Sequence, residues 1–89
     1  MNHEQFTRFY TEEKDRKAML KLTAAAYENF TVQPTIGYYR GEPDKSMVIE
    51  VGAASENSIS ALARRIRAMN GQKSVLVMRL NGRTTVIRD

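Results

Sequence analysis

The sequence contains no cysteine, no tryptophan and a single histidine, His3, among its 89 residues. The absence of cysteine excludes disulfides, thiolate zinc sites and cysteine nucleophiles. His3 stands near the N-terminus, a poor place for the base of a catalytic triad. The five glycines are scattered and form no phosphate-binding loop. We therefore expect no catalytic residue, no metal site and no cofactor, and we expect that the protein is not an enzyme.

Long apolar runs are also missing. No stretch approaches the roughly 20 apolar residues of a membrane-spanning helix. The first residues lack the basic and apolar regions of a secretory signal peptide. Apolar residues make up 42% of the chain and charged residues 27%, which is typical of a globular domain. We expect one small cytoplasmic domain over residues 1–89, with no membrane attachment.

Apolar periodicity predicts two helices, each followed by a hairpin. Leu20, Ala24 and Tyr27 recur at helical spacing, and Pro34 favours extended chain soon after them. The stripe from Ile59 to Met69 is clearly amphipathic. The predicted elements are a helix over residues 12–30, a hairpin over 35–51 with its turn at 41–45, a helix over 55–70 and a hairpin over 74–88, with residues 1–11 as an N-terminal arm or an extension of the first helix.

The last hairpin is predicted from Asn81-Gly82, which is a strong signal for a two-residue turn. The resulting order α-β-β-α-β-β favours an α+β domain with a four-stranded, mostly antiparallel sheet and two helices on one face. The second sheet face would carry Val75, Val77, Val86, Arg79 and Arg88. That face would be covered by the arm, a partner or a second subunit, and a homodimer is one of these options.

Positive charge is concentrated in the C-terminal part of the chain. Residues 55–89 hold seven basic and two acidic residues, whereas residues 1–54 hold seven basic and eight acidic ones. Arginine suits bidentate contacts to phosphate and carboxylate, so this part could meet nucleic acid, a phosphorylated ligand or an acidic protein. A solvated helix face and a protected sheet edge would explain the same charges. The candidate binding residues here are Arg64, Arg65, Arg67, Lys73, Arg79 and Arg83.

A second candidate site is the segment Tyr38-Tyr39-Arg40. Adjacent residues of a strand point to opposite faces, so we expect one tyrosine ring in the core and the other outside. The outer ring, next to Arg40, could stack on a base or anchor a protein contact. Core packing with an ordinary half-exposed tyrosine is the simpler interpretation of the same residues.

Four short segments together resemble small phage and mobile-element proteins. These segments are Tyr39-Arg40-Gly41, residues 44–49, Leu62-Ala63 and residues 72–77. The resemblance covers about residues 36–87, and the class includes anti-defence and anti-CRISPR proteins. It implies a protein that acts by binding a host component, and it assigns no functional residue.

These observations lead to three hypotheses about function. The first is a non-catalytic binding protein, encoded by a phage or mobile element, that masks or inhibits a host protein or a nucleic-acid-handling complex. The second is a protein that binds nucleic acid or a nucleotide signal, with a tyrosine stacked on a base and Arg40 facing phosphate. The third is an oligomeric structural or assembly protein.

Overall fold

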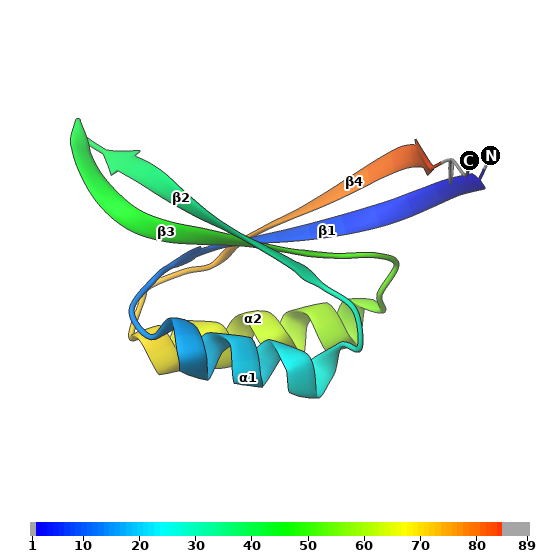
Figure 1. Ribbon diagram of the computed structural model, residues 1–89, viewed down its shortest axis with the longest axis horizontal. Coiled ribbons are helices and arrows are strands. Elements are labelled where there is room, and N and C mark those ends of the chain that lie inside the picture. The colour runs from blue at the N-terminus through cyan, green and yellow to red at the C-terminus, as the bar shows by residue number, and fades with distance from the viewer. Residues whose placement is uncertain (1, 85–89) are drawn as a thin grey trace, which may run out of the picture.

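Six elements follow one another in the order β-α-β-β-α-β (Figure 1). The computed structural model describes residues 2–84. Its elements are β1 (Asn2–Glu12), α1 (Arg16–Ala26), β2 (Thr31–Tyr39), β3 (Glu42–Val51), α2 (Glu56–Asn70) and β4 (Leu76–Thr84).

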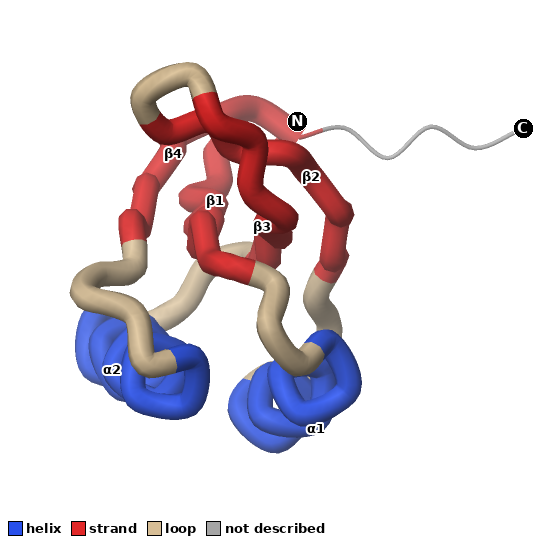
Figure 2. The backbone as a smooth tube through the Cα atoms, turned by 90° about the vertical axis from the view of Figure 1, so that its left-hand side faces the viewer, coloured by secondary structure: helices blue, strands red, loops and turns tan. Residues whose placement is uncertain are grey.

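The four strands form one antiparallel sheet in the spatial order β2-β3-β1-β4. Both helices lie on the same face of this sheet, and the other face is open (Figure 2). This is the ferredoxin-like arrangement. It confirms the predicted α+β class, with a four-stranded antiparallel sheet and two helices on one face. Within residues 2–84, no helix is both long and apolar enough to cross a membrane.

The prediction of an arm or helix over residues 1–11 was wrong, because this segment contains most of β1. The strand pairs with β3 on one side and with β4 on the other. Phe9 is fully buried, and its backbone partners are Ile49 and Val77. Thr7 and Thr11, which flank Phe9 on the same sheet face, are buried as well. As a central strand, β1 has its backbone N–H and C=O groups paired with neighbours on both sides.

The predicted hairpin over residues 74–88 was also wrong in its described part. Strand β4 runs straight through Asn81 and Gly82, which lie opposite Gln5 and Glu4 of β1. Because β1 supplies the antiparallel partner, the chain has no need to turn at this point. The remaining residues of that prediction, 85–89, lie outside the described part.

The sheet faces of β4 are therefore the reverse of those predicted. Val75 and Val77 pack against the core on the helix side of the sheet, whereas Leu76 and Met78 are exposed on the open face. Val86 and Arg88, expected beside the two valines, lie outside the described residues.

The helices differ in how closely they match their predicted bounds. For α2 the bounds nearly coincide, since Ser55 Oγ accepts from Ser58 N at 3.2 Å and Gly71 ends the helix with φ of 64°. Helix α1 is shorter than predicted. It begins after Asp15, which caps Ala18 N at 3.0 Å, and it ends before Tyr27, whose backbone is extended.

The core lies between the helices and the inner face of the sheet. Met19 comes from α1, and α2 contributes a stripe at helical spacing. Tyr27 Oη lies 3.0 Å from Ser58 Oγ and so links the two helices. The buried apolar residues are Phe9, Met19, Met47, Ile49, Val51, Ile59, Leu62 and Ile66.

The turn between β2 and β3 is tighter than the predicted turn at residues 41–45. It consists of Arg40 and Gly41, which have φ values of 51° and 82°. Two positive φ values in a two-residue loop match the twist of the flanking strands. Pro34 lies inside β2 opposite Met47, a position that is tolerated because β2 is an edge strand.

Replacing Gly41 with alanine should lower the free energy of unfolding by about 1 kcal/mol, because alanine is strained at positive φ. The matched control is Gly52→Ala. An added Cβ meets nothing within 4 Å at either glycine, and only Gly41 has a positive φ. Urea unfolding of both variants measures the difference. Equal stability of the two variants would contradict this account of the turn.

Candidate functional site

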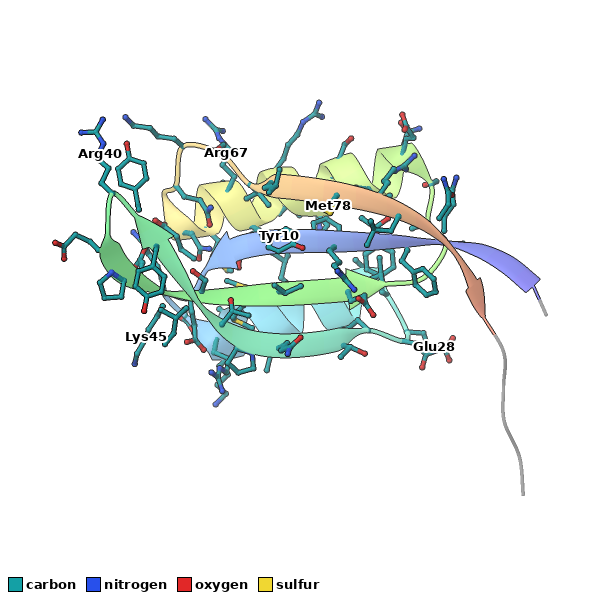
Figure 3. The ribbon with its side chains drawn as sticks, turned by 90° about the horizontal axis from the view of Figure 1, so that it is seen from above. Tyr10, Glu28, Arg40, Lys45, Arg67 and Met78 are labelled. Atoms are coloured by element: carbon teal, nitrogen blue, oxygen red, sulfur yellow. The ribbon has the colours of Figure 1, made fainter. Side chains whose placement is uncertain are left out.

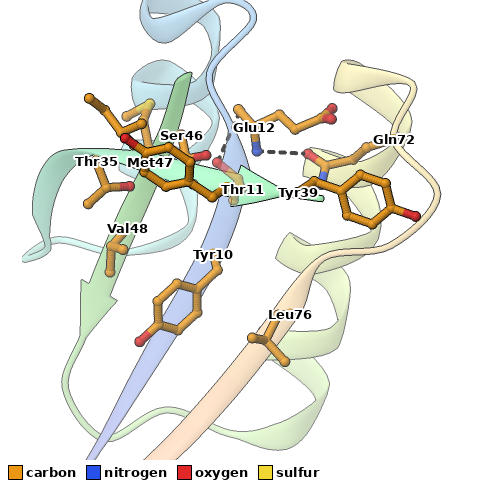
Figure 4. A pocket seen from close by; sticks show the side chains of 13 residues that line it. Tyr10, Thr11, Glu12, Thr35, Tyr39, Ser46, Met47, Val48, Gln72 and Leu76 are labelled. Carbon is orange, nitrogen blue, oxygen red and sulfur yellow. Dashed lines mark hydrogen bonds between the residues drawn. The ribbon is translucent and has the colours of Figure 1, made fainter. Parts of the chain in front are cut away.

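A groove lies where the β2–β3 hairpin projects beyond the end of β1 (Figure 4). Strand β3 pairs with β1 only as far as Ser46, so the hairpin tip has no third strand beside it. The groove has a volume of about 590 Å³. Its walls come from three strands, the loop after α2 and the start of β4. The lining residues include Tyr10, Thr35, Tyr39, Ser46, Gln72 and Leu76.

Three tyrosines line this groove, and two of them belong to the predicted segment. Tyr38 and Tyr39 are each 72% exposed. The expectation that one ring lies in the core was therefore wrong, because the hairpin tip extends past the helices that would have covered it. The Arg40 guanidinium carbon lies 5.3 Å from the centre of the Tyr39 ring, within cation–π range. Tyr10 of β1, which sequence reasoning did not single out, supplies the third ring.

A polar network fixes the loop after α2 against the end of β1. The buried Asn70 donates from Nδ2 to Glu12 O at 3.0 Å and to Gln72 Oε1 at 2.7 Å. Gln72 Nε2 in turn donates to Ser74 O at 2.7 Å. Glu12 N also donates to Gln72 Oε1, at 3.4 Å. These bonds hold Gln72 in the groove wall (Figure 4).

The structure places three of the predicted basic residues at one end of the molecule and the others elsewhere on α2 and β4. Arg67 Nε donates to Lys73 O at 2.8 Å, which places both residues at the C-terminal end of α2. Arg40 lies at the same end of the molecule (Figure 3). Arg79 pairs with Glu56 at 2.7 Å and so faces the start of α2. Arg64 and Arg65 are exposed on α2, and Arg83 lies in β4 opposite His3.

The open face of the sheet carries several apolar side chains, as expected for the second sheet face, but they are other residues than the predicted Val75 and Val77. We use the term open face for the side chains of Phe6, Tyr10, Val48, Leu76, Met78 and Leu80, which alternate with the buried ones along three strands. Tyr10 and Met78 can be followed in Figure 3. Arg8 and Glu50 lie among them and pair at 2.7 Å. The hydrogen bond to Glu50 raises the pKa of Arg8 above its usual value.

Chemically, the groove offers aromatic rings, hydroxyl groups and an amide. Within residues 2–84, no group of three histidine, aspartate or glutamate side chains is arranged as a metal site. Glu12 is the charged member of the groove lining, and it lies 3.7 Å from Lys14 Nζ. Such a site is suited to holding a planar polar ligand.

No family model matches the sequence, and neither does any curated protein. Solved structures do share its fold. CPII, a nitrogen regulatory PII-like protein from Thiomonas intermedia K12, was solved bound to ADP and bicarbonate. In that complex it is 12% identical over 90% of this chain and 86% of its own, with a TM-score of 0.61.

Two further structures are similar. A phage SAM lyase in its apo state is 16% identical over 89% of this chain and 81% of its own, with a TM-score of 0.64. A DUF3240 family protein from Shewanella baltica OS155 is 10% identical over the whole of both chains, with a TM-score of 0.67. At these identities the likeness shows the fold alone.

The Asn70 network predicts a specific loss of stability. Replacing Asn70 with alanine removes two hydrogen bonds at a buried position and should lower the free energy of unfolding by about 1–3 kcal/mol. Asn57→Ala on the exposed first turn of α2 is the control and should change it by less than about 0.5 kcal/mol. Urea unfolding followed by circular dichroism measures both. A loss at Asn70 no larger than at Asn57 would contradict the role of the network.

Proposed function

We propose that this protein is a non-catalytic binding protein whose groove binds an adenine nucleotide. The observation that carries the proposal is the groove itself, with its three tyrosines and its polar wall at Gln72, and with Arg40 over the ring of Tyr39. The comparisons support this choice of ligand. CPII shares the fold and was solved with ADP, and S-adenosylmethionine, the substrate in the name of the phage enzyme, also carries an adenosine group.

The base would lie in the groove. A volume of about 590 Å³ falls within the usual range of small-molecule sites. A base stacked on an aromatic ring gains about 1–3 kcal/mol, and the exposed ring of Tyr39 is available for this. The Gln72 amide and the Thr35 and Ser46 hydroxyls line the same groove and can bond to the edge of a base.

The phosphates would lie at the rim. Arg40 follows Tyr39 in the chain and Lys73 follows Gln72, so each groove wall leads directly to a basic residue. The Glu12 carboxylate, which lines the groove, would repel phosphate from the interior. This charge arrangement orients a nucleotide with its base inside and its phosphates towards Arg40 and Lys73.

Masking of a host protein, the first hypothesis from the sequence, stays a prediction. Exposed Tyr38, Tyr39 and Arg40 are residue types that dominate protein interfaces, so the same hairpin tip could serve that role. Of the similar structures described above, one is a phage protein and none is an anti-defence protein. Neither role requires a catalytic group, and the absence of enzymatic activity is part of the proposal.

Isothermal titration with ADP tests the proposed function. Wild-type protein should bind ADP, and Tyr39→Ala should weaken binding by roughly 5- to 100-fold through lost stacking. Arg40→Ala should weaken ADP binding more than adenosine binding, because it removes a phosphate contact. Arg64→Ala is the matched control, since Arg64 is exposed on α2 and does not line the groove.

Several outcomes would overturn the nucleotide proposal. One is the absence of binding to ADP, ATP and S-adenosylmethionine at about 1 mM ligand, where even affinities corresponding to roughly 4 kcal/mol are detected. Another is an equal effect of Arg40→Ala and Arg64→Ala. Capture of one host protein that depends on Tyr38 and Tyr39, without nucleotide binding, would favour the masking role.

A further inference from the structure

A second, smaller pocket lies at the opposite end of β3 from the groove, where the loop after α1 enters β2. Its volume is about 210 Å³, which is below the range of about 300–1,000 Å³ that is usual for sites of whole small molecules. It shares no lining residue with the groove. The pocket is therefore a separate site, and its size suits a single chemical group.

Gly52 leaves this pocket open. Thr7 pairs with Val51, so Phe6 and Gly52 are the next residues of the two neighbouring segments, and both line the pocket. The backbone does not require glycine at this position, because φ is not positive and an added Cβ would meet nothing within 4 Å. An aromatic ring can cover a glycine in a sheet, but the ring of Phe6 does not reach this one. The missing side chain at Gly52 therefore leaves free space beside Phe6.

The walls of the pocket combine aromatic rings with one carboxylate. Phe30 packs partly against the core, whereas Phe6 belongs to the open face and is half-buried there. Of the described residues that line the pocket, Glu50 alone is charged. A cation is attracted both by a carboxylate and by the negative faces of aromatic rings. The lining therefore favours a positively charged group that also has apolar surface.

The contact with Arg8 shows that the Glu50 carboxylate already accepts one cation. Arg8 Nε donates to Glu50 Oε2 at 2.7 Å, and within residues 2–84 no hydrogen bond reaches the second oxygen, Oε1. A carboxylate has about four lone-pair sites, so it can accept a second donor or face a second positive charge. Arg8 does not itself line the pocket. A cation in the pocket would therefore share Glu50 with Arg8 and compete with it.

The charges around the pocket differ from those around the groove. Glu28 directly precedes the lining residue Asn29 and is exposed. It lies at the opposite end of the molecule from Arg40 and Lys45 (Figure 3). Charges separated through solvent by more than about 8 Å are largely screened at physiological salt. The local carboxylates, and not the net charge of the chain, therefore decide which ligands this pocket attracts.

We propose that this pocket binds a methylated ammonium group, with the positive charge next to Glu50 and the methyl groups against Phe6 and Phe30. Aromatic rings recognise quaternary ammonium groups in this way, because the positive charge is spread over apolar methyl groups. The free space beside Gly52 is where the group would lie. The site is independent of the proposed nucleotide groove, since the two share no residue.

Choline and its neutral analogue 3,3-dimethylbutan-1-ol, in which a carbon atom replaces the charged nitrogen, are the probes. Each is titrated at constant ionic strength into ¹⁵N-labelled protein, and the amide chemical shifts are followed by NMR. Choline should shift the amides of residues 29–31 and 50–52, which form the pocket, and leave those of residues 71–76 beside the groove unchanged. The neutral analogue should bind roughly 3- to 30-fold more weakly, because it lacks the charge that the rings and Glu50 attract.

Four variants locate the ligand. Gly52→Val fills the pocket and should abolish the choline shifts, whereas Ala53→Val is the matched control, because Ala53 is the exposed neighbour that does not line the pocket. Glu50→Gln should weaken choline binding. Arg8→Gln should strengthen it, because it removes the cation that competes for Glu50. A purely structural role of this ion pair would change choline binding in the same direction in both variants. Circular dichroism confirms that each variant is folded.

Three results would overturn the proposal. The first is the absence of choline-dependent shifts at about 100 mM choline, where even very weak binding is detected. The second is equal affinity for choline and its neutral analogue, which would show that the charge is not recognised. The third is unchanged choline binding by folded Gly52→Val. Titration of Gly52→Val with ADP should give the wild-type result whether or not ADP binds, so the outcome at this pocket is separate from the test of the groove.

Discussion

The insertion of β1 between β3 and β4 is the constraint on which the rest of the structure depends. Phe9 on this strand is fully buried, and its neighbours on both sides contribute to the same core. Because β1 ends at Glu12, the β2–β3 hairpin continues alone and leaves the groove beside it. The same strand places Tyr10 on the open face. Core, groove and open face are therefore three consequences of one pairing.

The sequence predicted the elements whose signals are local. Helix α2 has an amphipathic stripe, and it forms over Glu56–Asn70, close to the predicted bounds. Strand β1 was missed because its inner face alternates Thr7, Phe9 and Thr11, so apolar alternation is weak there. The turn predicted at Asn81-Gly82 does not form, because β4 makes nine residue pairs with β1. These pairs outweigh the preference of the two residues for a turn.

The candidate site could be predicted only in part, for the same reason. Tyr39 and Arg40 were identified because they are adjacent in the chain. Tyr10, Gln72 and Leu76 complete the groove, yet they lie far apart in sequence and meet only once β1 is placed in the sheet. A count of charges along the sequence could not show that Arg40 lies beside the groove and Arg64 does not. The position of each depends on where its element lies in the fold.

Hydrogen exchange with and without ADP tests the central claim, that the groove beside β1 is the ligand site. The account predicts slower amide exchange over residues 35–40 and 71–76 when ADP is present, because these segments form opposite walls of the groove. Residues 61–68 of α2, which carry Arg64 and Arg65, should exchange at an unchanged rate. Protection confined to α2, or no protection at saturating ADP, would contradict the account.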